Sequence, residues 1–248
     1  MRESVMELNI IRKAMAHKTI SLHVLLTVFL VTNYSAITGA AETGKKSLLP
    51  DRSVITLPAP VYQGRMSVEE ALRKRESVRQ FSQSPLTEQE LAQLLWAAQG
   101  KTRDWAARTA PSAGALFPLE VYVVIREGVF RYSSGDHRIL RVVKTDVRRQ
   151  LAAAALGQDI IRQAPAVFVI AGVYKRTAEK YSNRAKRYVE IEAGHAGQNL
   201  LLQAVSLGLG AVPVGAFQDA HVKQTLHLPV NHEPLYLIPV GRKRFVPP

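Results

Sequence analysis

The sequence predicts an α+β fold for most of its 248 residues. Helical and strand-like patterns are mixed along the chain, without the regular βαβ alternation of a doubly wound sheet. Hydrophobic residues make up 47% of the chain and charged residues 21%, so it can bury a full core in one large domain or two small ones. This composition excludes a chain that is disordered throughout.

The first 41 residues are expected to form a secretory signal peptide. Basic residues precede a short apolar run at 20–31, and Gly39 and Ala41 supply the small residues at which such peptides are cleaved. We therefore expect export to the periplasm. The alternative is an uncleaved arm or a start codon placed too far upstream. The protein would then be cytoplasmic, and it would touch a membrane only through this segment.

Residues 42–65 are expected to form a proline-rich linker or arm, and residues 66–248 a folded domain. Three prolines and two glycines interrupt any periodic pattern in the linker. Two helices open the domain, each preceded by a capping box. The pairs are Ser67 with Glu70 and Thr87 with Glu90, and apolar residues follow each pair at helical spacing. The second helix is expected to end at Gly100.

The remaining elements follow from hydrophobic periodicity. Short apolar runs rich in β-branched residues predict strands, and longer amphipathic runs predict helices. In chain order we expect strands at 119–125 and 128–134, a helix at 144–157, a buried strand at 164–174, a long helix at about 177–207, a loop at 208–219, a short helix at 219–226 and a final strand at 233–241.

The net charge of +13 and the isoelectric point near 10.1 indicate an anionic partner. A nucleic acid is not expected, because no platform of arginines interleaved with aromatic residues is present. An acidic membrane surface and a phosphorylated small molecule remain. No metal site is expected, since the chain lacks cysteine and His221, His227 and His232 are scattered.

Two arginine segments are candidate phosphate ligands. Arg75, Ser77 and Arg79 alternate after the first helix, so in an extended chain their side chains share one face. Two guanidinium groups and a hydroxyl suit a phosphate or a planar polar edge. Arg242 and Arg244 alternate in the same way after the last strand. Taken separately, each segment also fits a solvated basic surface.

Two segments of small residues are candidate contacts for a flat ligand. Residues 111–117 read PSAGALF directly before a buried strand, and glycine and alanine allow close approach to the backbone. Residues 208–217 read GLGAVPVGAF, where Pro213 breaks the dinucleotide fingerprint GxGxxG. This second segment either presents backbone amides to a ligand or is an ordinary helix-to-strand turn.

Together these segments resemble the FMN-dependent nitroreductase superfamily, and most closely its SagB-type dehydrogenase branch. Their order is RESVRQF, PSAGALFPLEVYVV, EAGHAGQNLLLQAVSLGLGAVPVGAF and LYLIPVGRKR, and the resemblance covers roughly residues 66–245. It implies a central, mostly antiparallel sheet flanked by helices, with the flavin at a homodimer interface. It also implies two-electron (hydride) transfer through flavin N5, with NAD(P)H as the donor.

The resemblance further implies which residues bind FMN. The phosphate, the ribityl chain and the pyrimidine edge would be held by the two arginine segments, through Arg75, Ser77, Arg79, Arg242 and Arg244. The isoalloxazine ring would lie across the dimer interface against the small residues Pro111, Ser112, Ala113 and Gly114. The backbone amides that face flavin N5 and O4 would be those of Gly215 and Ala216.

The long helix is expected to supply part of the dimer interface. Ala193, Gly194, Ala196 and Gly197 place small residues where another helix could pack closely. His195 is expected to be a packed or hydrogen-bonded core histidine, with a role in the site as the alternative.

Enzymes of the SagB-type branch oxidise peptide azolines to azoles, and the resemblance implies a Lys-Tyr pair that acts as acid and base beside the flavin. The candidates are Lys180 and Tyr181, with a solvated helix start as the alternative. The substrate is thus either a small molecule or a peptide. A protein that only binds or scavenges flavin is a further possibility, and such a protein would not accept electrons from NAD(P)H.

Overall fold

The computed structural model describes residues 49, 53–104 and 107–244. Its strands are β1 Val54–Thr56, β2 Leu119–Ile125, β3 Gly128–Ser133, β4 Arg138–Val143, β5 Ala166–Gly172, β6 Gly210–Ala211 and β7 Glu233–Gly241. Its α-helices are α2 Val68–Lys74, α3 Glu88–Gln99, α4 Arg148–Ala154, α5 Asp159–Gln163, α6 Tyr174–Tyr181, α7 Ala185–Ser206 and α8 Asp219–Leu226. Two short 3₁₀ helices are η1 Ala113–Ala115 and η2 Ser182–Arg184.

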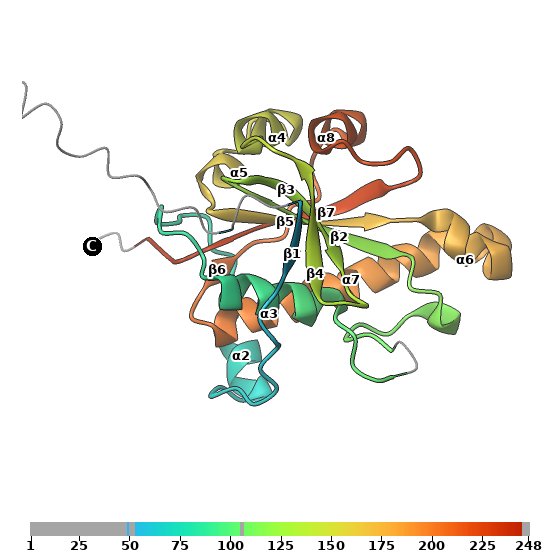
Figure 1. The fold of residues 1–248 in the computed structure, drawn as a ribbon, viewed down its shortest axis with the longest axis horizontal. Helices are drawn as coiled ribbons and strands as arrows, with labels where there is room; N and C mark the ends of the chain where they lie inside the picture. The colour runs from blue at the N-terminus through green and yellow to red at the C-terminus, as the bar shows by residue number, and fades with distance from the viewer. Residues whose placement is uncertain (1–48, 50–52, 105–106, 245–248) are drawn as a thin grey trace, which may run out of the picture. The chain divides into compact units, whose positions relative to one another are not determined.

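The strands form one sheet in the order β1-β4-β3-β2-β5-β7-β6, and every pair of neighbouring strands is antiparallel. Figure 1 shows α4, α5 and α8 on one side of this sheet and α3 and α7 on the other. The α+β prediction is therefore confirmed. None of the described helices is long and apolar enough to cross a bilayer.

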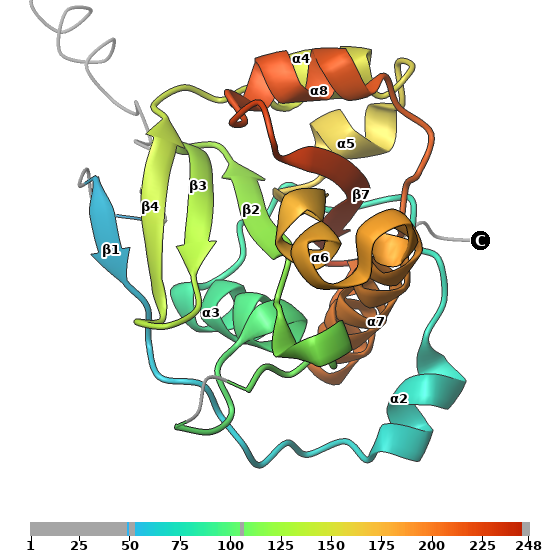
Figure 2. The ribbon, with the colours of Figure 1, turned by 90° about the vertical axis from the view of Figure 1, so that its right-hand side faces the viewer.

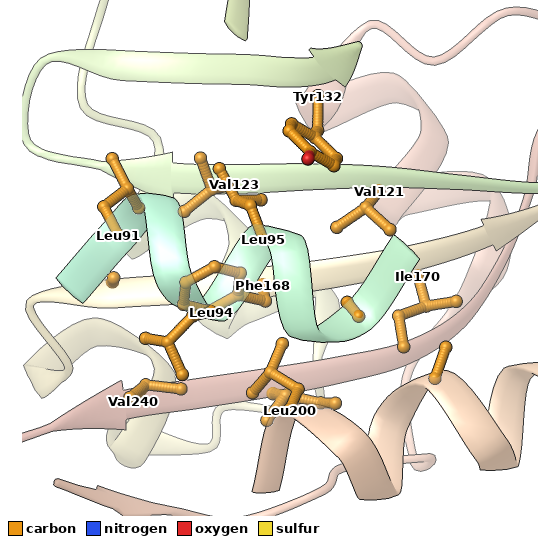
Figure 3. Close-up of a cluster of buried hydrophobic side chains, with 14 of the residues drawn as sticks. Leu91, Leu94, Leu95, Val121, Val123, Tyr132, Phe168, Ile170, Leu200 and Val240 are labelled. Atoms are coloured by element: carbon orange, nitrogen blue, oxygen red, sulfur yellow. The ribbon is translucent and has the colours of Figure 1, made fainter. Parts of the chain in front are cut away.

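Two hydrophobic layers hold the helices to the sheet. The central strand β5 is buried over all of its seven residues. On the side of α3 and α7, Leu94, Phe168 and Leu200 pack together with the side chains drawn in Figure 3. Each such side chain contributes about 1.5–3 kcal/mol when fully buried. This packing fixes β7, and one of the two arginine segments follows directly after that strand.

The predicted helix starts are confirmed, with one difference. Thr87 and Glu90 form the complete capping box at the start of α3. Ser67 caps α2 by accepting from the Glu70 amide over 3.1 Å, whereas the Glu70 carboxylate pairs instead with Lys74 at 2.5 Å. A cation one turn away offers that carboxylate a charged partner.

The predicted linker is partly built into the sheet. Val54–Thr56 forms the edge strand β1 against β4, and Ile55 and Leu57 are buried. Figure 2 shows β1 and β4 side by side at the end of the sheet. Neither strand was predicted, because the arginines of β4 and the prolines around β1 obscure their apolar alternation. The predicted signal peptide at residues 1–41 lies outside the described residues.

The long helix predicted at about 177–207 is wrong, because the chain breaks near Ser182. That residue has φ 48° and ψ −122°, which no helix tolerates, and η2 then separates α6 from α7. The predicted helix at 144–157 is also shorter. Asp146 accepts from the Arg148 amide over 3.1 Å at its start, and Leu156 ends it with a φ of 59°.

The small residues of α7 do not form one exposed face. Ala193, Ala196 and Gly197 are buried, and a Cβ built on Gly197 would lie 3.3 Å from the Tyr236 ring of β7. Gly197 therefore packs against this chain's own sheet, and its predicted place at a dimer interface is wrong. His195 is exposed, which corrects the prediction of a core histidine. A period of 3.6 residues turns position 195 away from the face that 193, 196 and 197 share.

Candidate functional site

The segment after α2 is extended and pairs with β6. Ser77 forms a parallel bridge with Ala211, and the Val78 amide donates to the Ala211 carbonyl over 3.0 Å. Successive side chains of an extended chain point to opposite sides, so Arg75, Ser77 and Arg79 share one side. The alternation on which the phosphate prediction depends is therefore present.

The C-terminal arginine segment runs beside this one. The Ser82 amide donates to the Arg242 carbonyl over 2.9 Å, and the Arg244 amide donates to the Gln80 carbonyl over 3.0 Å. Backbone hydrogen bonds thus join two arginine segments that lie at opposite ends of the domain in sequence. Such a concentration of positive charge attracts an anion.

One of the guanidinium groups in these segments is already paired. Arg242 donates to both carboxylate oxygens of Glu90, over 2.9 and 3.2 Å. Within the described part of the chain, the side chains of Arg75, Arg79 and Arg244 form no hydrogen bond or ion pair. Arg79 and Arg244 are also exposed. Three guanidinium groups are therefore available to a ligand, while Glu90 holds Arg242.

The loop after β6 presents exposed backbone. Val214 exchanges two backbone hydrogen bonds with Leu237 of β7, over 2.8 and 3.0 Å, and the next residues, Gly215 and Ala216, are exposed. A Cβ built on Gly215 would meet nothing within 4 Å. The amide N–H groups of Gly215 and Ala216 donate to no described residue. Both can therefore donate to a ligand.

Residues 111–117 form a tight turn that leads into β2. The Phe117 amide donates to the Ser112 hydroxyl over 2.9 Å and closes the turn. Gly114 has a φ of +63°, which favours glycine. Ala115 and Phe117 also have positive φ, at 53° and 45°. Left-handed non-glycine residues are uncommon, and they concentrate at ligand-binding sites.

The last residues of α6 lie against this turn. A Cβ built on Gly114 would lie 2.9 Å from the Tyr181 hydroxyl and 3.1 Å from Lys180 Nζ. Lys180 Nζ lies 5.5 Å from the centroid of the Tyr181 ring, and the Tyr188 ring meets that ring edge-on at 5.1 Å. The approach of these two side chains is therefore a second reason for a glycine at 114. Sequence reasoning identified the turn and the pair separately, without their contact.

The predicted site residues thus form two groups. The first, which we call the arginine group, consists of Arg75, Ser77, Arg79, Gly215, Ala216, Arg242 and Arg244. The second, the turn group, consists of Pro111, Ser112, Ala113, Gly114, Lys180 and Tyr181. No hydrogen bond or β-bridge between described residues joins the two groups.

A buried carboxyl that sequence reasoning missed lies near the turn group. Glu192 of α7 is 3% exposed, and burial raises its pKa to about 7, against smaller lowering effects of the Ser112 and Gln99 side chains. Its Oε1 has no hydrogen-bond partner among the described residues. The signal in the sequence is a glutamate on the face that carries Val189 and Ala196, where an apolar residue is expected.

The histidines do not form a metal centre in the described part of the chain, which holds no suitable group of three His, Cys, Asp or Glu side chains. His232 is buried and shares a hydrogen bond with the Tyr122 hydroxyl over 2.7 Å. His221 bonds to the side chain of Gln218.

Comparison with known proteins places the chain in a family. The Nitroreductase family matches residues 72–242. "Putative nitroreductase MJ1384" of Methanocaldococcus jannaschii is 46% identical over 184 residues, which cover 72% of this chain and 92% of that protein. The crystal structure of "a putative nitroreductase" from Ralstonia eutropha is 31% identical to this chain and has a TM-score of 0.72. The match covers 81% of this chain and 97% of that one.

A more distant structure shares the fold. The Escherichia coli microcin synthetase McbBCD complex, with truncated pro-MccB17 bound, is 21% identical and has a TM-score of 0.63. The match covers 84% of this chain and 82% of that one.

Proposed function

Since this chain belongs to the nitroreductase family of oxidoreductases, we propose that it binds FMN and transfers two electrons as a hydride, with NAD(P)H as the donor. The observation that carries the proposal is the meeting of the two arginine segments. Arg75, Arg79 and Arg244 bring three guanidinium groups without described partners to one part of the fold. A phosphate is the ligand that such a group suits.

The arginine group also fits the rest of FMN. Ser77 adds a hydroxyl beside Arg75 and Arg79, which suits the polar ribityl chain. Gly215 is open on the side where a Cβ would stand, so a flat ring could approach the backbone there. The free amides of Gly215 and Ala216 suit the polar atoms at the edge of such a ring. The described residues hold no second segment with a nucleotide-binding pattern, which favours FMN over FAD.

In this proposal the protein supplies position and charge. A bound flavin would supply the ability to accept and release a hydride at N5. The backbone amides of Gly215 and Ala216 would orient the ring by donating hydrogen bonds to its edge. Arg75 and Arg79 would stabilise negative charge on the ligand, because fixed cations in a partly dehydrated site act more strongly than in water.

Figure 1 shows β6, beside the arginine group, and α6, which carries Lys180 and Tyr181, at opposite ends of the sheet, and this separation supports a homodimer with shared sites. We propose that the arginine group of one chain and the turn group of its partner enclose one flavin. Residues 61–68, α3 and α7 line a cavity of about 620 Å³, where Val61, Tyr62 and Val68 expose 53, 75 and 65% of their surface. Apolar groups exposed to this extent beside a cavity suit burial by a partner chain.

A second candidate function is the oxidation of peptide azolines to azoles, as in the SagB-type branch. The contact of Lys180 and Tyr181 with Gly114 favours it, because it brings an amine and a phenol to the turn where the ring is proposed to lie. Two proton-transfer groups at that position are what an acid–base pair requires. The fold likeness to the microcin synthetase complex is compatible with this candidate.

Two measurements on the purified chain test the main proposal. Mass spectrometry of the released chromophore should identify FMN, and anaerobic NADH or NADPH should bleach the flavin absorbance. Arg75→Ala should weaken FMN binding about tenfold or more, because a hydrogen bond to a charged group contributes about 1.5–3 kcal/mol. The matched control is Arg149→Ala, an exposed arginine on α4, which should bind FMN normally.

Other outcomes would contradict specific parts of the proposal. Stoichiometric FAD would exclude the assignment of the arginine group to a terminal phosphate. Bound FMN that neither NADH nor NADPH reduces would indicate a protein that binds or scavenges flavin. Equal FMN affinity in Arg75→Ala and Arg149→Ala would move the phosphate site elsewhere.

A further inference from the structure

A polar cavity opens where β2 and β3 separate. The ladder between these strands runs from Ile125 and Gly128 to Tyr122 and Arg131, whereas β2 already begins at Leu119. The first three residues of β2 therefore have no partner on β3 in this ladder. A cavity of about 310 Å³ lies at this end of the strands, and its lining includes Gln99, Arg108, Glu120, Arg131, Tyr132 and Arg176.

The lining carries an excess of positive charge. It contains three guanidinium groups against one carboxylate, Glu120. That carboxylate is already paired, since Arg176 donates to it over 2.5 Å and to the Phe117 carbonyl over 3.2 Å. Arg108 and Arg131 therefore face this cavity without a carboxylate partner among the described residues.

The half-buried guanidinium group of Arg108 makes few of the hydrogen bonds open to it. Its Nε is buried and has no partner in the described chain, and its Nη1 reaches the Gln99 carbonyl only at 3.5 Å. Its guanidinium group lies 5.5 Å from the centroid of the Phe117 ring. Burial lowers its pKa, as expected for a cation removed from water. Such a group is costly unless an acceptor satisfies it.

The side-chain amide of Gln99 lies beside the Glu192 carboxyl but makes no full hydrogen bond. It is 3% exposed, and its Nε2 has no hydrogen-bond partner among the described residues. Buried amide groups are nearly always hydrogen-bonded, so an orphaned donor calls for an explanation. Gln99 also lines the cavity, but its side chain has a carboxyl of this chain beside it, so Arg108 is the group that needs an added acceptor.

We propose that this cavity binds a small oxyanion, either a carboxylate or a phosphate group. Such a ligand would supply the missing acceptor for Arg108 and would offset the charge of Arg131. The volume suits a small molecule, since it lies at the lower end of the range of about 300–1,000 Å³ for ligand pockets. The site differs from the arginine group and does not depend on the FMN proposal.

The ligand would act at the base of the turn group. Phe117 ends the turn and lines the cavity, and Arg176 lies on α6, the helix that carries Lys180 and Tyr181. An anion held by Arg108 would therefore lie between the segment after α3 and the start of α6. Occupancy of the cavity should fix α6 relative to the turn.

Isothermal titration calorimetry of the full chain tests this proposal with inorganic phosphate and, separately, malonate, at ionic strength held constant with sodium chloride. At least one probe should bind, and which one binds identifies the oxyanion. Arg108→Gln should weaken that binding by about tenfold or more. Arg131→Gln is the second variant, in case loss of Arg108 impairs folding. Arg149→Gln is the matched control and should bind as the native chain does.

Saturating the chain with FMN before the titration separates this cavity from the proposed flavin phosphate site, because the flavin would occupy the arginine group and leave this cavity free. Absence of binding by both probes in the native chain would overturn the proposal. So would binding to the FMN-saturated chain that stays unchanged in both Arg108→Gln and Arg131→Gln.

Discussion

The carboxyl of Glu192 makes the stability of the fold depend on pH. Burial raises its pKa from 4.5 to about 7, so the folded chain holds this proton more tightly than the unfolded chain does. The stability that comes from this group is complete below the unfolded pKa. It is lost as the pH rises through the folded value near 7.

Replacing Glu192 by Gln should remove this pH dependence. The free energy of unfolding of the native chain should fall relative to the variant by at most about 3 kcal/mol between about pH 5 and about pH 8. Denaturant unfolding of both chains at the two pH values measures this difference. Other titrating groups, such as His137 and His232, remain in both chains and cancel in the comparison. A difference that does not change with pH would contradict the assigned pKa.

Tyr181 tests the second candidate function at the same scale. Tyr181→Phe keeps the ring and removes the hydroxyl that lies against Gly114. If Lys180 and Tyr181 act as acid and base, turnover of a thiazoline-containing peptide should fall by about a hundredfold or more, whereas FMN content should not change. Tyr188→Phe is the matched control, since Tyr188 is the neighbouring phenol. Equal activity in both variants would show that the Tyr181 hydroxyl has no catalytic role.

In helix α7, packing against β7 decides which glycine tolerates a larger side chain. Gly197→Leu should destabilise the chain by about 1–3 kcal/mol, because its side chain would overpack against Tyr236 and Ile238 of β7. Gly194→Leu is the control, since a Cβ built there meets nothing within 4 Å. It should be neutral or slightly stabilising, because leucine favours helix more than glycine does. Equal destabilisation by both changes, measured by denaturant unfolding, would contradict this packing.

At the scale of elements, sequence patterns predicted the buried strands and the two helices with side-chain caps, α2 and α3. The strand at 119–125, the helix at 219–226 and the strand at 233–241 have the predicted bounds. The missed elements are short or partly exposed, as in β1 and β4, where no continuous apolar pattern distinguishes a strand from a loop. The break at Ser182 was missed because it is set by backbone dihedral angles and not by hydrophobic periodicity.

At the scale of the whole molecule, the sequence identified the segments of the candidate site but not how they are grouped. Spacing was sufficient to select Arg75, Ser77 and Arg79, because alternation in an extended segment is a local property. That Glu90 already holds Arg242, and that Tyr181 reaches Gly114, depends on tertiary contacts. The role of Glu192 depends in the same way on burial, which one helical glutamate does not reveal.

Export is a prediction for the whole chain. The basic start, the apolar run at 20–31 and the small residues up to Ala41 have the order of a signal peptide. Cleavage after Ala41 would keep every residue that the structure describes. N-terminal sequencing of protein from fractionated cells should find periplasmic chains that begin near Glu42. Full-length, flavin-loaded protein in the cytosol would refute export and would favour peptide azoline oxidation.

The central claim, that two chains share each flavin, is tested most directly by mixing two defective variants. Arg75→Ala damages the arginine group, and Gly114→Val damages the turn group by placing a branched side chain at a φ of +63°. Each variant should bind FMN poorly. After unfolding and joint refolding, half of the dimers should be mixed, and each mixed dimer should contain one intact site. FMN binding should therefore return to roughly a quarter of all sites, as measured by flavin fluorescence. If each flavin were bound within one chain, the mixture would bind no more FMN than the separate variants, and the claim would be contradicted.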